Sequence, residues 1–195
     1  MIKELQQWDE VLFLYLNSHR LDWLDPIMKT LTGTFIWIPL YAFLVYLIFK
    51  AYGMKGFWYV GFIVLLILMA DKFTSGFMKP FFERLRPCHD PRWEGMINTY
   101  AGCGGKYGFA SSHASNTFAI ASYMFLVFRG KIRAMGWLFL WAGVISYTRI
   151  YLGVHYPADI LVGALVGIAC GWITFSLVEW LRMLADTKAH QRKSV

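Results

Sequence analysis

Charged residues are absent from long stretches of the chain and return in short clusters. No residue between Lys29 and Lys50 is charged, and the stretch from Leu31 to Phe49 is long enough to cross a hydrocarbon core of about 30 Å as a helix. Four further apolar stretches cover residues 57–78, 112–128, 134–154 and 160–178. The pattern predicts an all-α fold, a polytopic transmembrane helix bundle with about five spans.

The connections between these stretches contain little sequence. Residues 50–56 and 129–133 are so short that the helices on either side are predicted to be antiparallel neighbours. The chain has no internal repeat, no low-complexity tract and no linker that would separate two domains. We therefore expect a single membrane-embedded domain over residues 1–195.

The first thirty residues follow another pattern. Their apolar stretch, residues 11–16, is too short to span a membrane and is flanked by charged residues. Trp8, Leu12 and Tyr15 recur at helical spacing, which is typical of an amphipathic helix that lies in the membrane interface. We predict that residues 1–30 are an interfacial segment, and their acidic residues and short apolar stretch argue against a cleaved signal peptide.

Composition and charge agree with a membrane protein. The chain is 57% hydrophobic and 16% charged, whereas an ordinary soluble domain is about 25% charged. The formal net charge is +7, but no basic stripe is interleaved with polar surface, so a nucleic-acid partner is not expected. Anionic lipid headgroups or phosphorylated substrates are the partners that this charge favours.

Several ionisable residues lie where the predicted spans end. With five spans, Asp71 and Lys72 fall near the end of the second, and Arg149 falls near the end of the fourth. His113 and Asp159 lie where the third and fifth spans begin. All of these ends share the side of the membrane that holds residue 1. Because ionisable groups at the edge of hydrocarbon are costly and usually mark a working site, we expect a functional site on this side.

Three segments on this side carry cations, hydroxyls, imidazoles and a carboxylate. Their candidate residues, in chain order, are Lys79, Arg86, Ser111, Ser112, His113, Arg149, His155 and Asp159. Three permanent cations near one point repel each other unless an anion with several negative oxygens lies between them, and a phosphoryl group fits. Ser111 and Ser112 stand where the third span begins, so they can cap that helix and direct its free N–H groups at the anion.

The histidines and the carboxylate can perform phosphoryl transfer through a covalent intermediate. Asp159 would fix the tautomer of His155 that leaves one ring nitrogen free to attack phosphorus. His113 would protonate the leaving group. This scheme needs no metal and no cofactor. Two histidines and one aspartate can also bind a metal, but the adjacent cations would oppose a divalent ion.

These segments resemble the three signature motifs of the type 2 phosphatidic acid phosphatase family of membrane lipid phosphatases. The residues that match the first and third motifs are Lys79, Arg86, Pro87, Arg149, His155 and Asp159. In the second motif, Pro-Ser-Gly-His, only Ser111 and His113 match. Ala110 and Ser112 replace the proline and the glycine, and Thr148 replaces the serine of the third motif. The order and spacing of the motifs are those of the family.

The resemblance implies a metal-independent phosphohistidine hydrolase on a helical membrane core, with His155 as nucleophile and His113 as acid. Two alternatives use the same residues: a vanadate-dependent haloperoxidase, whose known examples are larger and soluble, and an anionic-lipid transporter or scramblase, which needs no nucleophile. The motifs do not identify the lipid substrate. Undecaprenyl diphosphate, phosphatidylglycerophosphate, phosphatidic acid, diacylglycerol pyrophosphate and phosphorylated lipid A are all compatible.

Lysine and arginine are denser on the membrane side opposite the candidate site, which predicts that this side is cytoplasmic. The active-site loop, residues 79–113, is then periplasmic or extracellular at the cell (inner) membrane, and residues 182–195 form a cytoplasmic tail. The resemblance agrees, since bacterial members of the family commonly face outward.

Three further features of this side have more than one interpretation. Cys88 and Cys103 lie in the active-site loop, where they form a disulfide in an oxidising compartment or remain free. Asp71 orients a neighbouring lysine or takes part in proton movement. Arg84 has no fixed role in the motif, and we expect a local ion pair with Glu83.

Overall fold

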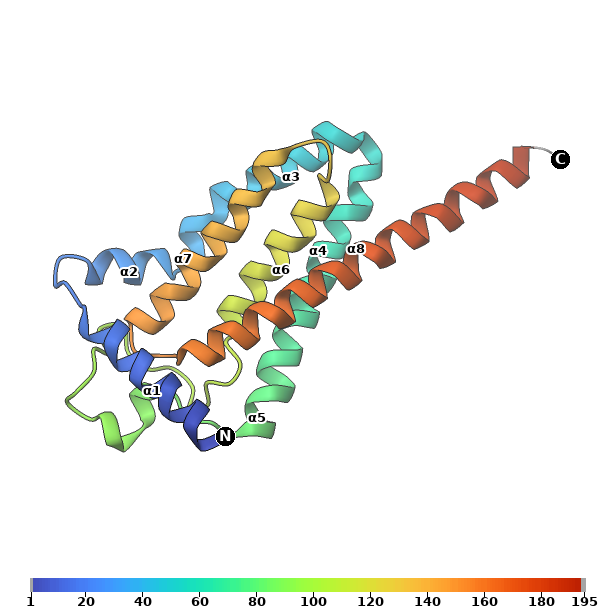
Figure 1. The fold of residues 1–195 in the computed structure, drawn as a ribbon. Helices are drawn as coiled ribbons and strands as arrows, with labels where there is room; N and C mark the ends of the chain where they lie inside the picture. Colours follow the sequence, from blue (N-terminus) through green and yellow to red (C-terminus); the bar gives the residue numbers. More distant parts are fainter. Residues whose placement is uncertain (1, 194–195) are drawn as a thin grey trace.

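The computed structural model describes residues 2–193, with side chains for residues 3–187. In this part of the chain all the regular secondary structure is helical (Figure 1), with no strand among the described residues, which confirms the predicted all-α class. The α-helices are α1 (Ile2–Ser18), α2 (Asp25–Leu31), α3 (Ile38–Tyr52), α4 (Gly56–Asp71), α5 (Lys79–Phe82), α6 (Ser112–Val127), α7 (Trp137–Tyr151) and α8 (Pro157–Lys193). Short 3-10 helices cover Phe35–Trp37, Gly53–Lys55, Pro87–His89, Pro91–Trp93 and Arg133–Gly136, and a π-helix, Lys72–Met78, joins α4 to α5.

Two helical stretches, Phe35–Phe82 and Pro157–Thr187, are long and apolar enough to cross a membrane. The first one reverses at Gly53, where the backbone has a φ of 53°, so α3 and α4 are antiparallel (Figure 1). The helices α6 and α7 are 16 and 15 residues long, shorter than the ~20 residues of a typical span. The structure therefore supports fewer spans by length than the predicted five, and the number five stays a prediction.

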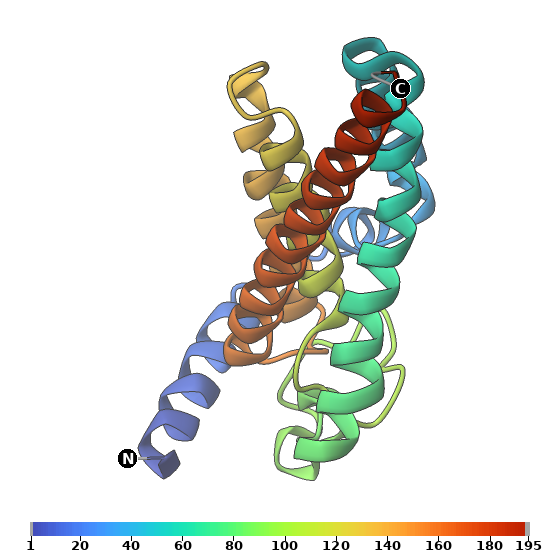
Figure 2. The same cartoon turned by 90° about the vertical axis from the view of Figure 1, so that its right-hand side faces the viewer.

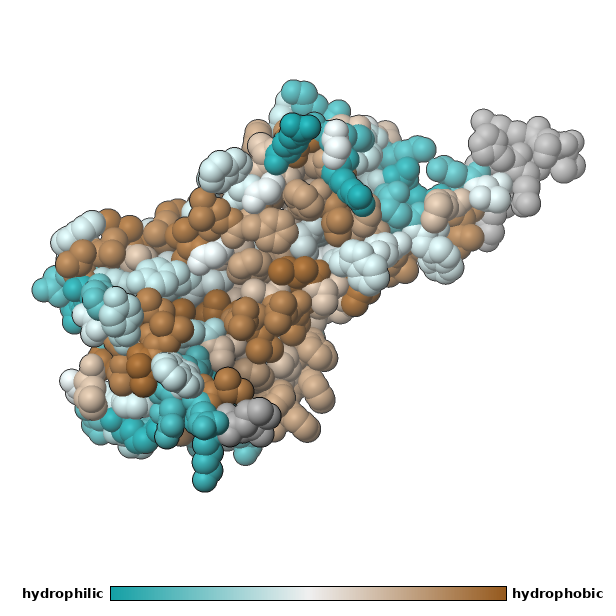
Figure 3. Space-filling view, viewed as in Figure 1, coloured by the Kyte–Doolittle hydropathy of each residue, from teal (hydrophilic) through white to brown (hydrophobic). Residues whose placement is uncertain are grey.

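The surfaces that face away from the helix bundle are apolar. Val64, Leu140, Leu161 and Trp172 are all exposed, on three different helices. In Figure 3 hydrophobic side chains gather over the middle of the molecule and hydrophilic ones toward its two ends. Exposed apolar surface of this extent requires a nonaqueous neighbour, and this distribution agrees with a bilayer.

The helices α6 and α8 make the closest contact in the bundle. Gly163, Gly167 and Gly171 recur every four residues on α8, and each faces α6. A Cβ atom at Gly163 would overlap the carbonyl oxygen of Ser111, and one at Gly167 would overlap that of Ser115. Glycine thus lets the two backbones touch, as small residues do in membrane helix pairs. This contact fixes the start of α6 beside the start of α8.

The N-terminal helix α1 is attached to the same end of the bundle. Its Phe13 is buried against Tyr156, with ring centroids 5.2 Å apart. The amide of Asn17 donates to the backbone carbonyls of Ile150 and Tyr151 at 3.1 and 2.9 Å. The opposite face of α1 carries exposed apolar side chains, among them Trp8. An amphipathic helix is therefore present where the sequence predicts one, while its place in the membrane interface stays a prediction.

The loop after α5 is braced by a covalent bond. Cys88 and Cys103 form a disulfide with a Cα–Cα distance of 5.7 Å, which settles the first of the open interpretations. Figure 2 shows this loop and α1 at one end of the molecule, with the far end of α8 at the other. The helix α8 continues to Lys193, so residues 182–193 of the predicted tail are helical. Residues 194 and 195 of that tail lie outside the described residues.

Candidate active site

The candidate residues come together where α5, α6, α7 and α8 meet the disulfide-braced loop. The charges of Lys79, Arg86, Arg149 and His155 all lie within electrostatic range of the His113 ring. Arg86 is in the loop after α5, and His155 is in the loop between α7 and α8. The other candidate residues lie at or next to helix ends. Segments far apart in the sequence, such as those of Lys79 and His155, therefore converge on one point.

His155 and Asp159 form a buried pair at the start of α8, where both side chains are almost inaccessible to solvent. Asp159 Oδ2 lies 3.3 Å from Nδ1 of His155 and accepts a hydrogen bond from the Tyr156 backbone N–H at 3.0 Å. Burial lowers the pKa of His155 to about 4, although Asp159 opposes the shift. The ring is therefore neutral at pH 7, and its Nε2 is the nitrogen left free for chemistry.

Lys79 is held by a row of hydroxyls. Its Nζ donates to Ser112 Oγ at 2.9 Å and to Ser75 Oγ at 3.4 Å. Thr74 Oγ1 donates to the same Ser112 oxygen at 3.1 Å, and Ser75 Oγ donates to Asp71 at 3.3 Å. Asp71 thus reaches Lys79 through Ser75. Thr74 and Ser75 belong to the π-helix, an element that recurs at functional sites because it re-aims side chains.

Arg86 is oriented by the loop that follows it. Its Nε donates to the carbonyl of Tyr107 at 3.2 Å and its Nη1 to that of Cys103 at 3.3 Å. Gly108 lies against both Arg86 and the His155–Asp159 pair: a Cβ there would be 3.0 Å from Asp159 Oδ2 and 3.2 Å from Arg86 Cγ. Any larger residue at this position would push the cation and the carboxylate apart.

The start of α6 presents the remaining candidates. Ser111 is the N-cap, and its Oγ accepts from the Ala114 N–H at 3.4 Å. Its own N–H donates to the carbonyl of Asp159 at 3.0 Å. Arg149 Nη1 donates to Thr32 Oγ1 at 2.8 Å, and its Nε has no hydrogen-bond partner among the described residues. A buried guanidinium with an unused donor is suited to receive an anion.

The expected ion pair between Glu83 and Arg84 is wrong. Arg84 Nη1 donates to Asp159 Oδ1 at 2.9 Å, and Nη2 donates to Asp9 Oδ2 at 2.6 Å. Glu83 instead accepts from the Tyr107 hydroxyl at 3.3 Å. The helix C-cap explains the difference, because Glu83 adopts a left-handed conformation that ends α5, so Arg84 lies beyond the helix and meets other partners. Arg84 is a site residue that sequence reasoning missed, and its two-residue spacing from Arg86 was the available signal.

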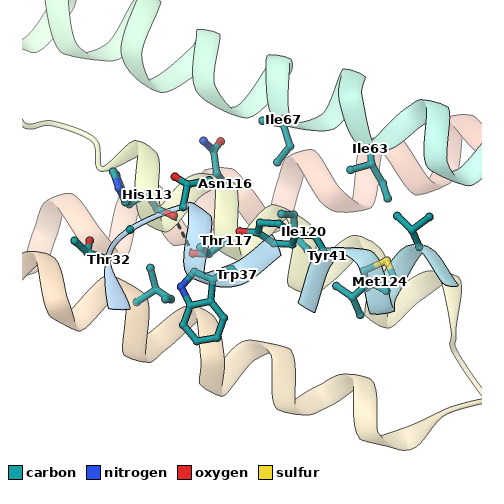
Figure 4. A pocket seen from close by; sticks show the side chains of 15 residues that line it. Thr32, Trp37, Tyr41, Ile63, Ile67, His113, Asn116, Thr117, Ile120 and Met124 are labelled. Atoms are coloured by element: carbon teal, nitrogen blue, oxygen red, sulfur yellow. Dashed lines mark hydrogen bonds between the residues drawn. The ribbon is translucent and has the colours of Figure 1, made fainter. Parts of the chain in front are cut away.

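An apolar pocket opens beside His113 (Figure 4). Its volume is about 410 Å³, and it lies among α3, α4, α6 and α7. The labelled lining includes Trp37, Tyr41, Ile63 and Met124. No group of three or more His, Cys, Asp or Glu side chains that could hold a metal ion occurs within the described part of the chain.

Several known proteins resemble this chain in sequence or fold. A family model for the PAP2 superfamily matches residues 58–183. A lipid A 4'-phosphatase of Bacteroides thetaiotaomicron is 35% identical over 192 residues, which cover 96% of this chain and 85% of the relative. The crystal structure of Aquifex aeolicus LpxE is similar with a TM-score of 0.64 and 29% identity, over 85% of this chain and 93% of that one.

A second solved structure, a transmembrane PAP2 type phosphatidylglycerolphosphate phosphatase from Bacillus subtilis, has a TM-score of 0.68. It is 19% identical and covers 92% of this chain and 87% of its own, so it supports the fold alone. The chain belongs to the PAP2 superfamily. The class predicted from its motifs, a membrane lipid phosphatase, is confirmed by these relatives.

Proposed function

We propose that this chain removes a phosphate group from a lipid A type lipid at the outward face of the inner membrane, through a phosphohistidine intermediate. The observation that carries the chemistry is the buried pair of His155 and Asp159 beside His113. The cations Lys79, Arg86 and Arg149 act on His113, which also lines the apolar pocket. The relative from Bacteroides thetaiotaomicron, which aligns over almost the whole chain, supports the choice of lipid.

The reaction has two halves. In the first, Nε2 of His155 attacks phosphorus while Asp159 holds Nδ1, so that an N–P bond forms as the P–O bond to the lipid breaks. His113 gives its proton to the departing oxygen. In the second half His113 takes a proton from water, the resulting hydroxide attacks phosphorus, and the N–P bond breaks. Inorganic phosphate leaves and His155 returns to its neutral state.

The substrate-binding residues stabilise the charge that develops on the phosphoryl oxygens. Lys79, Arg86 and Arg149 would surround the equatorial oxygens, where negative charge spreads in the transition state. Ser111 and Ser112 would add the N–H groups at the start of α6 and a hydroxyl. The donors that now contact protein groups, such as Lys79 Nζ on Ser112, would turn to the phosphate when it binds.

The apolar pocket supports a lipid rather than a soluble phosphate ester. It begins at His113 and continues along α6 through Asn116 and Ile120 to Met124, so an acyl chain can lie there while the phosphate is at the histidines. Asn116 Oδ1 is buried and has no hydrogen-bond partner among the described residues. It is one turn of helix deeper than His113 (Figure 4), where an amide or hydroxyl of an acylated sugar can pair with it.

Phosphate release by purified protein across a panel of lipids tests this function. We expect the highest kcat/KM on a lipid A 4'-phosphate and a lower one on undecaprenyl diphosphate, which has no amide. Asn116→Leu should lower kcat/KM on the lipid A substrate about tenfold, the cost of one lost hydrogen bond of about 1.4 kcal/mol, and leave undecaprenyl diphosphate unchanged. Equal losses on both lipids would argue against this use of Asn116.

The two other classes of function can be tested with the same preparation. A haloperoxidase would oxidise halide when vanadate and peroxide are supplied, and a scramblase would move labelled lipid between leaflets without releasing phosphate. We expect neither activity. Vanadate should inhibit phosphate release, because it resembles pentacoordinate phosphorus, and EDTA should not.

We also propose the membrane arrangement predicted from the sequence. The helices α3, α4, α6, α7 and α8 would form five spans of one domain over residues 1–195. The active-site loop, residues 79–113, would face outward, and residues 182–195 would be cytoplasmic. The apolar outer surfaces of α4, α7 and α8 support this arrangement.

A further inference from the structure

One carboxylate of α1 reaches the centre of the site. Asp9 is 8% exposed, and its Oδ2 lies 2.6 Å from Nη2 of Arg84. Its other oxygen, Oδ1, accepts a hydrogen bond from the backbone N–H of Ala158 at 2.8 Å. Asp9 lies outside residues 58–183, which the family model matches. The N-terminal helix therefore contributes a contact that the three motifs do not contain.

The backbone contact caps α8 from another helix. Ala158 is the second residue of α8, and its N–H belongs to the first turn, where backbone donors lack partners within the helix. A carboxylate at this end is also favoured by the helix dipole. Asp159 is the next residue, so Asp9 holds the turn that carries the catalytic carboxylate.

Arg84 joins Asp9 to Asp159. Its Nη1 is 2.9 Å from Asp159 Oδ1, and its guanidinium carbon lies 4.1 Å from the ring centroid of Tyr156. Asp159 then has Oδ1 on Arg84 and Oδ2 on His155 and on the Tyr156 N–H. Because each oxygen has its own donors, the Asp159 carboxylate is held in a single orientation. That orientation sets the hydrogen bond which orients the His155 ring.

Two carboxylates contact Arg84 in this position. Its planar guanidinium uses one nitrogen for Asp159 and the other for Asp9, so both ends of the group are fixed. Without Asp9, Nη2 loses its partner and Arg84 can rotate so that it contacts both oxygens of Asp159. This movement changes the contact on Oδ1.

We propose that Asp9 is a positioning residue of the catalytic centre: through Arg84 and the first turn of α8 it fixes the Asp159 carboxylate, and thereby the tautomer and direction of the His155 ring. The proposal rests on the proposed function for its kinetic test. It makes α1 part of the site rather than only a membrane anchor.

The neighbouring acidic residue provides a matched control. Glu10 lies on the same helix and binds Arg92 at 2.8 Å, but Arg92 is 57% exposed and neither residue contacts the histidine pair. Asp9→Asn and Glu10→Gln each remove one negative charge from α1 without changing side-chain size. Only the first removes a contact to Arg84.

For Asp9→Asn we expect kcat to fall ~10- to 100-fold with KM within twofold of the wild type, because the phosphate-binding cations are untouched and only the nucleophile is misaligned. Glu10→Gln should keep kcat within twofold. Asp9→Glu, which retains the charge, should recover part of the lost kcat. Equal kcat values for Asp9→Asn and Glu10→Gln would overturn the proposal, as would a loss of kcat that only follows the loss of folded protein in thermal unfolding.

The ring itself gives a readout that does not depend on turnover. In ¹⁵N NMR spectra of histidine-labelled protein, the wild type and Glu10→Gln should show His155 protonated at Nδ1 alone, whereas Asp9→Asn should show both tautomers. Identical His155 signals in all three proteins would overturn the positioning role. If the wild type releases no phosphate from any lipid, the proposed function fails, and the tautomer measurement still decides the role of Asp9.

Discussion

At the scale of single residues, the two histidines of the site differ in their partners. His155 has one ring nitrogen on Asp159 and is fully buried, whereas His113 lines the apolar pocket. These environments match the roles proposed for them, a nucleophile held in one tautomer and an acid that meets the leaving lipid oxygen.

Replacing either histidine tests these roles. We expect His155→Ala to abolish measurable phosphate release, since it removes the nitrogen that attacks phosphorus, and His113→Ala to lower kcat ~10²- to 10⁴-fold. His89→Ala is a matched control, because His89 is in the same loop region but bonds only the Gly104 carbonyl. Retained activity in a folded His155→Ala protein would rule out the phosphohistidine mechanism.

The pH dependence follows from the burial of His155. Its pKa is lowered from 6.5 to about 4, so the ring stays unprotonated and nucleophilic well below pH 6.5. We expect the acid limb of kcat, measured at saturating lipid, to have its midpoint between pH 6.5 and 4. The unfolded chain takes up this proton near pH 6.5 and the folded chain only near 4, so folded-state stability should fall as pH drops through that window. An acid limb above pH 6.5 would contradict the assignment.

The sequence predicts the residues of the site that belong to the motifs and misses those that depend on packing. Lys79 and His155 follow from spacing, because a phosphate needs cations and a nucleophile at fixed places along the chain. Asp9 and Gly108 have no such signal. Asp9 accepts from the Ala158 backbone N–H, and Gly108 lies against the side chains of Arg86 and Asp159. These contacts are decided by how α1 and the loop pack on α8.

At the scale of helices, the five apolar stretches predict where helices lie but not how these helices pack. The stretch predicted at residues 134–154 contains α7 only from Trp137 to Tyr151, since its ends form a 3-10 turn and a loop. The spacing of Gly163, Gly167 and Gly171 is visible in the sequence. The sequence does not show which helix packs against this glycine face, because α6 and α8 are separated by two turns and a whole helix.

The contact between α6 and α8 predicts that two glycine-to-alanine substitutions change the stability of the protein in different directions. Alanine in a helix interior is normally more stable than glycine by about 1 kcal/mol, so Gly143→Ala on α7, where a Cβ meets nothing within 4 Å, should raise the unfolding temperature or leave it unchanged. Gly167→Ala should lower stability by about 1–3 kcal/mol, because its Cβ would overlap the Ser115 carbonyl and force the helices apart. Thermal unfolding in detergent compares the two, and equal shifts would show that the helices separate without cost.

At the scale of the whole molecule, the site lies at one end of a bundle that is apolar around its middle. The N-terminal helix, the disulfide-braced loop and the starts of α6 and α8 all meet at that end (Figure 2). A disulfide is stable in an oxidising compartment, so its presence in the loop agrees with an outward-facing site. The basic turn between α6 and α7 lies at the opposite end, where positive residues favour the cytoplasm.

This orientation predicts which positions an impermeant reagent reaches in intact cells. In a protein with Cys170→Ala, we expect a membrane-impermeant maleimide to label Met96→Cys, an exposed loop position, before lysis. Lys131→Cys, in the turn between α6 and α7, should be labelled only after the membrane is opened. Both positions are solvent-exposed, so a difference between them reports the side of the membrane and not burial. The reverse pattern would place the site in the cytoplasm, where neither the disulfide nor the density of basic residues would have a physical reason.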